Sequence, residues 1–284
     1  YTFIATNQSA DSYRYIEEFN NYLGNPTQNY NNDLKEYFTF DSYVKDIYSI
    51  TTYYIVSFVT DNYHILMALW AAVFSYFFLK SFRFFVNREE FQTSLVGSLL
   101  AFLFIFSNNI FNINGVRFNT AVWIAVYSVF EIVINKNYKY LLLAFITPLV
   151  HISYISFVTV LLLYIFFSKF EKTWVILFFI SIFISEISVE LLQKYQMQLP
   201  PAIQGMIWSY ASEDNLVERY QAIESVPTYA KILNVLPRYF ILALMSYFII
   251  NSKKIKYMTE YRNVYRFLLL WLTFCNFTMA VPSF

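Results

Sequence analysis

The sequence has little charge for its length. Only 14% of its 284 residues are charged, whereas 58% are hydrophobic and 22% are aromatic. A soluble domain typically carries about 25% charged residues, so this composition excludes an ordinary soluble enzyme. The chain has no basic stripe and no nucleic-acid-binding motif, and its net charge is only +1. We therefore expect no nucleic-acid partner.

Residues that hold metals or form disulfides are also scarce. Cys275 is the only cysteine, so an intrachain disulfide cannot form. No Asp-x-Asp motif occurs, and no histidine and cysteine cluster has the spacing of metal ligands. The sequence therefore predicts neither a metal site nor a cofactor.

The sequence is instead rich in long apolar runs. Several approach the ~20 apolar residues that span a bilayer. We predict an all-α polytopic membrane protein, with residues 1–284 forming one membrane domain of about eight segments. The predicted spans are 64–82, 94–113, 118–134, 174–192, 238–250 and 264–281, together with an unusual region at 141–168. The chain does not begin with methionine, and we expect at least one further span before Tyr1.

The basic residues predict the orientation of these spans. Lysine and arginine gather in short loops on the cytoplasmic side of membrane proteins, and here they follow residues 82, 134, 168 and 250. The acid-rich connections are residues 1–63, 112–117 and 193–237, which we place outside. Within the first of these, residues 44–60 are predicted to form an interfacial amphipathic helix. The loop 193–237 is predicted to be a lid.

Residues 141–168 do not fit a single span. As one helix they would reach ~42 Å, which is long even for a tilted span. Both flanks are basic, which indicates that the chain returns to the side that it left. We therefore expect two short segments or a re-entrant hairpin with His151 near the tip, on the same side as Arg117. Broken helices at membrane depth are tolerated where they line a polar cavity.

Three segments resemble a known family, the EpsG-like, Wzy-type polysaccharide polymerases of bacterial inner membranes. Residues 11–15 (DSYRY) form an acidic segment followed by arginine and tyrosine, just outside the predicted spans. Residues 115–121 (GVRFNTA) resemble the family's G-x-R-x-x-x-A at the head of a span. Residues 141–153 (LLLAFITPLVHIS) resemble its short apolar segment ending in His-x-Ser.

The resemblance implies a membrane glycosyltransferase similar to the GT-C type. Such an enzyme joins oligosaccharide repeats carried on polyprenyl diphosphate, at the external face of the inner membrane. The implied partners are the lipid-linked donor and acceptor and the bilayer, with a chain-length regulator as a further partner. The sugar and the linkage cannot be carried over.

This chemistry needs a group that stabilises the diphosphate and a group that takes a proton. Arginine pairs bidentately with phosphate oxygens without a metal, and Arg117 begins a predicted helix, whose amides favour anions. His151 is the first candidate for the base, because an unperturbed histidine titrates near pH ~6.5. Glu186, Glu190 and Asp11 are the alternative bases. The candidates for substrate binding are Asp11, Arg14, Asn114, Arg219, Tyr220 and Arg238.

Structural roles compete with each of these assignments. Arg117 and Arg238 could mark the membrane boundary by extending their charged ends to water. His151 could cap a short helix, and Glu186 could solvate a helix end. Tyr15 is expected to anchor the first segment at the membrane. A flippase of lipid-linked sugars is the main alternative function, followed by a membrane O-acyltransferase and a structural subunit.

Overall fold

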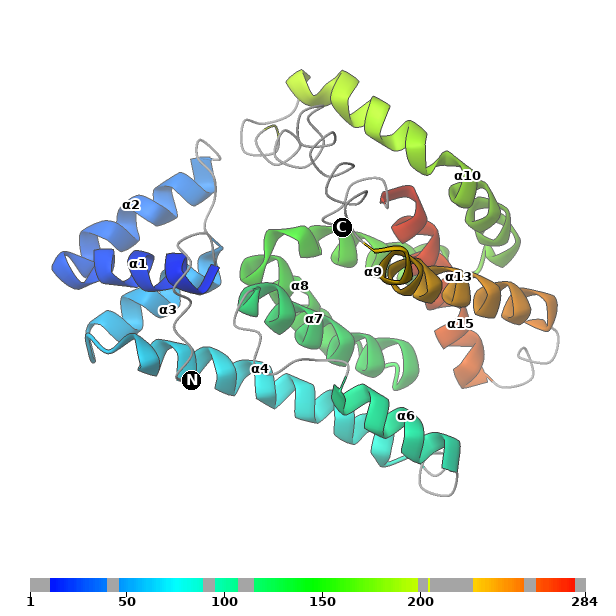
Figure 1. The fold of residues 1–284 in the computed structure, drawn as a ribbon, viewed down its shortest axis with the longest axis horizontal. Helices are drawn as coiled ribbons and strands as arrows, with labels where there is room; N and C mark the ends of the chain where they lie inside the picture. Colours follow the sequence, from blue (N-terminus) through cyan, green and yellow to red (C-terminus); the bar gives the residue numbers. More distant parts are fainter. Residues whose placement is uncertain are drawn as a thin grey trace. The chain divides into compact units, whose positions relative to one another are not determined.

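The structure is a computed structural model that describes residues 11–39, 46–88, 95–106, 115–198, 204, 227–252 and 259–278. Figure 1 shows the chain as a set of helices, and the described residues contain no strand. The predicted all-α fold is therefore confirmed. The chain divides into two compact units, Tyr1–Val158 and Thr159–Phe284.

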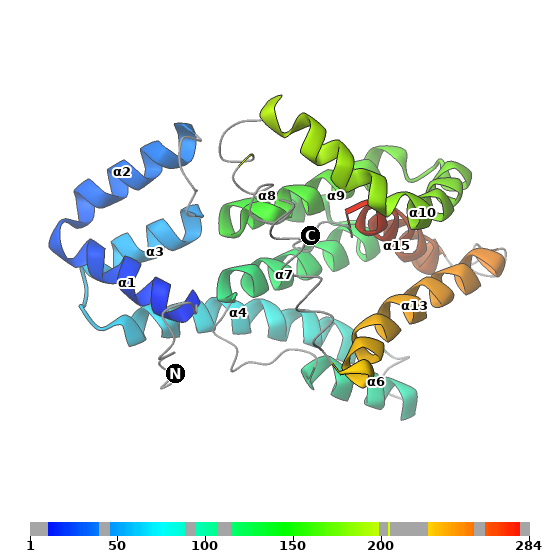
Figure 2. The same ribbon diagram turned by 45° about the horizontal axis from the view of Figure 1, so that its top comes forward.

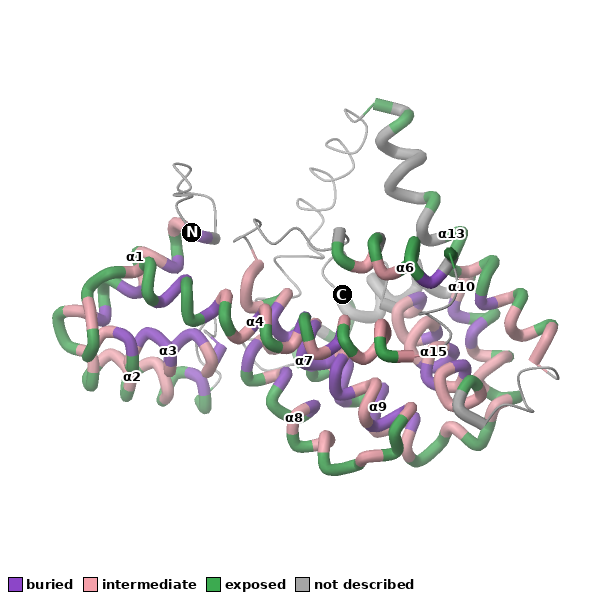
Figure 3. The backbone as a smooth tube through the Cα atoms, turned by 90° about the horizontal axis from the view of Figure 1, so that it is seen from below, coloured by how far each residue is buried: buried purple, intermediate pink, exposed green. Residues whose placement is uncertain are grey.

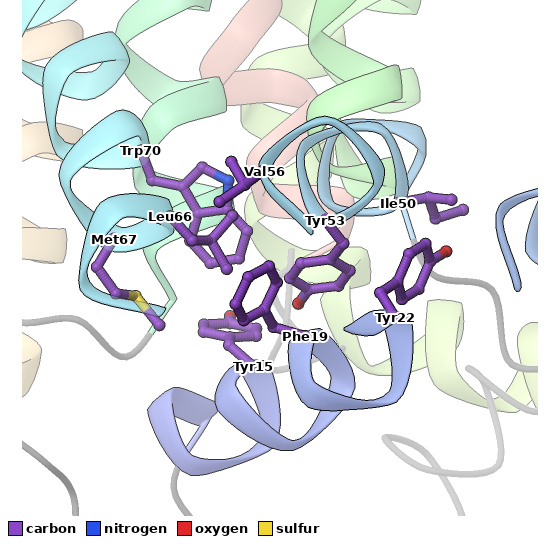
Figure 4. Close-up of a cluster of buried hydrophobic side chains, with 9 residues drawn as sticks. All are labelled: Tyr15, Phe19, Tyr22, Ile50, Tyr53, Val56, Leu66, Met67 and Trp70. Carbon is purple, nitrogen blue, oxygen red and sulfur yellow. The ribbon is translucent and has the colours of Figure 1, made fainter. Parts of the chain in front are cut away.

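An aromatic core organises the N-terminal part of the first unit. Helices α1 (Asp11–Gly24), α2 (Pro26–Thr39) and α3 (Ile47–Ser57) pack together, and α3 also contacts α4 (Tyr63–Val86). The indole nitrogen of Trp70 is buried and donates to Thr52 Oγ1 at 2.9 Å, so its polar end is satisfied. Figure 4 shows the buried cluster, which consists of Tyr15, Phe19, Tyr22, Ile50, Tyr53, Val56, Leu66, Met67 and Trp70.

The expected membrane-anchoring role of Tyr15 is wrong. Its side chain is 1% exposed, and its ring meets Trp70 edge-on with the ring centroids 5.2 Å apart. The helical repeat places Tyr15, Phe19 and Tyr22 on one face of α1, since positions three and four apart are neighbours. That face packs on α3 and α4 and not on lipid.

Three helices form the other half of the first unit. Helix α7 (Val116–Val129) contacts both α4 and α8 (Leu141–Val150), and α6 (Leu95–Phe106) contacts α4 (Figure 2). Trp123 of α7 meets Phe78 of α4 edge-on, with the ring centroids 4.9 Å apart. Buried positions run along α7 and α3 in Figure 3. A π-helix, η1 (Phe130–Ile134), continues α7 directly.

The unusual region breaks at His151, as the sequence predicts. Pro148 lies inside α8 and has no N–H to donate to Ala144, four residues earlier. The carbonyl of Ala144 accepts from Thr147 Oγ1 instead, at 2.7 Å. The backbone of His151 is extended, and the short 3-10 helix η3 (Ile152–Tyr154) then leads into α9 (Ile155–Phe167). Residues 141–168 are thus two short segments, while their return across the membrane stays a prediction.

A left-handed glycine begins α7. Gly115 has φ 72° and ψ 24°, a conformation that costs other residues strain because of their Cβ atom. An added Cβ would meet only Asn119 Nδ2, at 3.9 Å, so space does not limit this position. The left-handed backbone conformation alone therefore explains why position 115 is a glycine.

Gly115→Ala should lower the free energy of unfolding by about 1 kcal/mol, because alanine would be held in the left-handed region. The measurement is denaturant unfolding of the purified protein in detergent. Gly24→Ala is the matched control, since Gly24 ends α1 without a positive φ and a Cβ there meets nothing within 4 Å. Equal stability changes in the two variants would contradict the argument.

The second unit contains α10 (Glu171–Tyr195), η4 (Gln196–Gln198), α13 (Thr228–Ile250) and α15 (Thr259–Thr278). Phe178, Met245 and Leu269 are buried together at its centre. Glu171 at the start of α10 pairs with Arg266 of α15 at 3.3 Å. Asn276 also donates to Ser181 Oγ at 3.1 Å, so polar contacts join α10 and α15 at two levels.

Two helices are long and apolar enough to cross a membrane among the residues that the structure describes: Tyr63–Val86 and Val116–Ile134. They contain the predicted spans 64–82 and 118–134. Shorter apolar helices are Tyr138–Val150, Ile152–Phe167 and Tyr239–Ile250. The other predicted spans fall on α6, α10 and α15 or partly outside the described residues, and eight segments and the GT-C likeness stay predictions.

Candidate functional site

A buried ion pair marks the start of α7. Arg117 Nη1 lies 2.9 Å from Asp46 Oδ2, and the two side chains are 14% and 5% exposed. Burial weakens competition from water and strengthens the attraction, but each charge loses its hydration. A pair at this depth therefore needs further bonds to each partner.

Asp46 makes those bonds with its other oxygen. Its Oδ1 accepts from the backbone N–H of Ile152 at 3.1 Å. Asp46 is also the N-cap residue of α3, yet its side chain makes no capping hydrogen bond. The carboxylate of a cap residue usually accepts from its own helix. Here it is directed to Arg117 and to the residue after His151, so it connects α3, α7 and η3.

Tyr15 holds the other side of the guanidinium. Arg117 Nε donates to the Tyr15 hydroxyl at 3.4 Å, and the guanidinium carbon lies 5.0 Å from the centre of the ring. The contact thus combines a hydrogen bond with a cation–π interaction. Behind Tyr15, the Tyr53 hydroxyl donates to Glu18 Oε2 at 3.0 Å, which places a carboxylate near this polar group.

His151 lies beside the ion pair. Its ring meets Phe118, the neighbour of Arg117, edge-on with the ring centroids 5.4 Å apart. Its backbone N–H donates to Thr147 and its carbonyl accepts from Tyr154, which fixes the extended turn. The imidazole is half-buried. The break in the helix thus brings His151 to the end of α7 that carries Arg117.

The neighbouring charge of Arg117 and the start of the helix after His151 both favour a carboxylate at Asp46. A cation in the first turn of a helix opposes the helix dipole, so Arg117 needs a nearby anion. Asp46 supplies it and lies at the N-terminus of the helix after His151, where the dipole favours a negative charge. Burial nevertheless raises the pKa of Asp46 to about 6, although Arg117 and the Ile152 amide lower it.

The structure brings together two of the predicted site residues, Arg117 and His151. Arg14 lies on α1 and is exposed, and Asp11 begins the same helix. Glu186 lies on α10 and Arg238 on α13, in the second unit, so their predicted convergence on this site is untested. Asn114, Arg219 and Tyr220 lie outside the described residues.

Sequence reasoning missed the role of Asp46. It treated Asp46 only as one of several acidic residues on the external side. One signal was available, because an aspartate directly before an apolar helix is a typical N-cap residue. Nothing in the sequence shows that its side chain leaves that helix. The Tyr15 hydroxyl was also missed, since its contact joins positions 102 residues apart.

A sequence model of the EpsG family matches residues 1–283 of the chain. No curated protein and no solved structure matches it. The family suggests a role like that of a polysaccharide polymerase, and the apolar helices fit a membrane protein. The three motifs that resemble such polymerases fall within the matched range, and two of them contain Arg117 and His151. The chain therefore belongs to the EpsG family.

Proposed function

We propose that the protein is a polysaccharide polymerase, a glycosyltransferase that joins oligosaccharide repeats carried on polyprenyl diphosphate at the external face of the inner membrane. The observation that carries the proposal is the buried guanidinium of Arg117, held in place by Asp46 and Tyr15 beside His151. The family match supports it independently.

Arg117 is proposed to stabilise the diphosphate. Its bonds to Tyr15 and Asp46 use Nε and Nη1, and no described residue accepts a hydrogen bond from Nη2. The end of the planar fork that includes Nη2 can therefore pair with two phosphate oxygens. The N-terminal amides of α7 add to the attraction for an anion.

The proposed reaction forms one bond and breaks one. The acceptor hydroxyl oxygen attacks the anomeric carbon of the donor sugar, and the bond from that carbon to the diphosphate breaks. The diphosphate leaves with the electron pair and its added charge, which Arg117 stabilises. The hydroxyl proton passes to His151.

Asp46 has a positioning role in this proposal. It holds Arg117 on one oxygen and the amide after His151 on the other. The two proposed functional groups thus share one rigid support, which catalysis requires because small misplacements cost large factors in rate. A flippase would also need a diphosphate site, but it has no need of a base beside it.

The purified protein in liposomes should convert lipid-linked repeat units into a ladder of longer oligomers, resolved on a gel. Because arginine takes the place of a metal, the ladder should persist in excess EDTA. Activity that vanishes with EDTA and returns with Mg²⁺ would contradict metal independence. Unchanged repeat units that cross the liposome membrane would instead indicate a flippase.

A further inference from the structure

A pocket lies at the end of the first unit away from Arg117. It has a volume of about 480 Å³ and is bordered by α4, the C-terminal part of α7, the 3-10 helix η2 (Tyr138–Tyr140) and α8. Tyr127 in its wall is ten residues after Arg117 on α7, a rise of ~15 Å. Figure 2 shows α7 between α4 and α8. The pocket is therefore separate from the proposed active site.

Cationic and hydroxyl groups line one side of this pocket. Lys80 Nζ lies 4.8 Å from the centre of the Tyr76 ring and 5.2 Å from that of Tyr127, which restrains the ammonium group by cation–π contacts. The hydroxyls of Tyr127 and Tyr140 are 3.4 Å apart. Lys139 and Asn137 complete the polar side.

The other side is apolar and open. It consists of Phe77 together with Leu142, Leu143 and Ile146 on one stretch of α8. Leu142 is 75% exposed and Ile146 is 45% exposed. Large exposed apolar side chains on a helix of a membrane protein favour contact with acyl chains. The pocket thus has a basic, hydroxyl-lined part continuous with an apolar surface.

One acidic group lies close to the pocket. Glu131, in η1, interacts electrostatically with Tyr127, and its Oε2 accepts a hydrogen bond from Asn135 Nδ2 at 3.0 Å. Its charge offsets one of the two lysines, and Lys136 follows in the same turn with a left-handed φ of 57°. The two lysines that line the pocket, Lys80 and Lys139, outnumber Glu131, so the local charge is positive.

We propose that this pocket binds the headgroup of an anionic phospholipid. The phosphate pairs with Lys80 and Lys139, and the tyrosine hydroxyls and the Asn137 amide hydrogen-bond to its polar substituents. The acyl chains follow Leu142 and Ile146 along α8. Basic pockets between membrane helices bind anionic headgroups in this manner. The proposal is independent of the polymerase activity, since it uses no residue of the Arg117 site.

Native mass spectrometry of the detergent-purified protein tests this proposal. Phosphatidylglycerol, phosphatidylcholine and inorganic phosphate are titrated separately. Each lysine near an anionic headgroup contributes about 1 kcal/mol, so Lys80→Gln or Lys139→Gln should weaken phosphatidylglycerol binding about fivefold. The double variant should weaken it about 25-fold. Phosphatidylcholine should bind the wild type no better than it binds the double variant.

Two further variants make the result specific. Lys35→Gln removes the same charge from an exposed position on α2, in the same unit but outside the pocket, and should leave binding unchanged. Lys80→Arg with Lys139→Arg keeps both charges and should retain affinity for phosphatidylglycerol, which separates charge from folding. The proposal would be overturned by equal binding of the two lipids, by an equal loss of binding in Lys35→Gln, or by inorganic phosphate that binds as tightly as the lipid.

Discussion

Arg117→Lys should lower the rate of polymer formation by about 10²–10³, although it keeps the positive charge. Lysine has no planar fork, so it cannot hold the diphosphate through two parallel bonds while it also contacts Asp46 and Tyr15. Removal of one preorganised donor to a developing negative charge typically costs this factor. The measurement is the initial rate of ladder formation from lipid-linked repeats.

The control for this substitution is Arg83→Lys. Arg83 is an exposed arginine in the last turn of α4 and lies outside the site. The polymerisation rate of Arg83→Lys should therefore stay within about twofold of the wild-type rate, because surface substitutions usually change free energies by no more than about 0.5 kcal/mol. His151→Gln in the same assay removes the proton acceptor but keeps a hydrogen-bonding group. Near wild-type rates in Arg117→Ala and His151→Ala, on correctly folded protein, would show that the site is elsewhere and that these residues are structural.

Asp46→Asn should lower kcat by at least about tenfold with a smaller change in KM. The amide can still accept from Ile152, but it presents either a donor or a neutral oxygen to Arg117 Nη1, so the guanidinium loses its charged support. A loss of orientation acts mainly on the chemical step. An unchanged kcat would contradict the positioning role of Asp46.

The pH dependence of this pair gives a second, independent measurement. Because the pKa of Asp46 is raised to about 6, the carboxyl takes a proton as the pH falls from 7 to 5, and the charge that supports Arg117 is lost. The wild-type rate should fall over this range through Asp46. The relative rate of Asp46→Asn to wild type should therefore rise there.

The contribution of Asp46 to stability should increase as the pH falls, whereas the rate decreases. The pKa of Asp46 is higher in the folded protein than in the unfolded chain, so its contribution to stability is fully present below about pH 4 and is lost as the pH rises through 6. The difference in unfolding free energy between wild type and Asp46→Asn isolates this contribution. Asp46 interacts electrostatically with Arg117, Glu18 and Tyr37. These groups are present in both proteins, so effects of their titration that are the same in both proteins cancel in the difference. A wild type that loses stability relative to Asp46→Asn on acidification would contradict the assignment.

The sequence predicted the features that depend on local chemistry. The length of residues 141–168 and their basic flanks indicated two short segments with His151 between them, and the apolar run after Arg117 indicated the start of a helix. The long apolar runs predicted an all-α fold. These features follow from backbone geometry and hydrophobic length, which are readable residue by residue.

Contacts between distant segments could not be predicted in this way. Tyr15 and Tyr22 resemble interfacial tyrosines in sequence, because an aromatic face of a helix looks the same whether it packs on lipid or on another helix. Asp46 looks like an ordinary helix cap until its partners at positions 117 and 152 are known. The identity of a helix's neighbour, and not its own pattern, decides these roles.

The long chain separation within the site has a consequence for biosynthesis. The bond from Asp46 to the amide of Ile152 joins positions 106 residues apart, which corresponds to roughly 5–20 s of translation at about 5–20 residues per second. Arg117 follows Asp46 by 71 residues, so for most of that interval the carboxylate has neither partner, and its bond to η3 can form only at the end of it. Contacts between distant positions also form slowly after synthesis. Helices α1 to α4 are therefore synthesised before the proposed catalytic groups exist, and the proposed site can be complete only after α8 and the turn that follows it have been made.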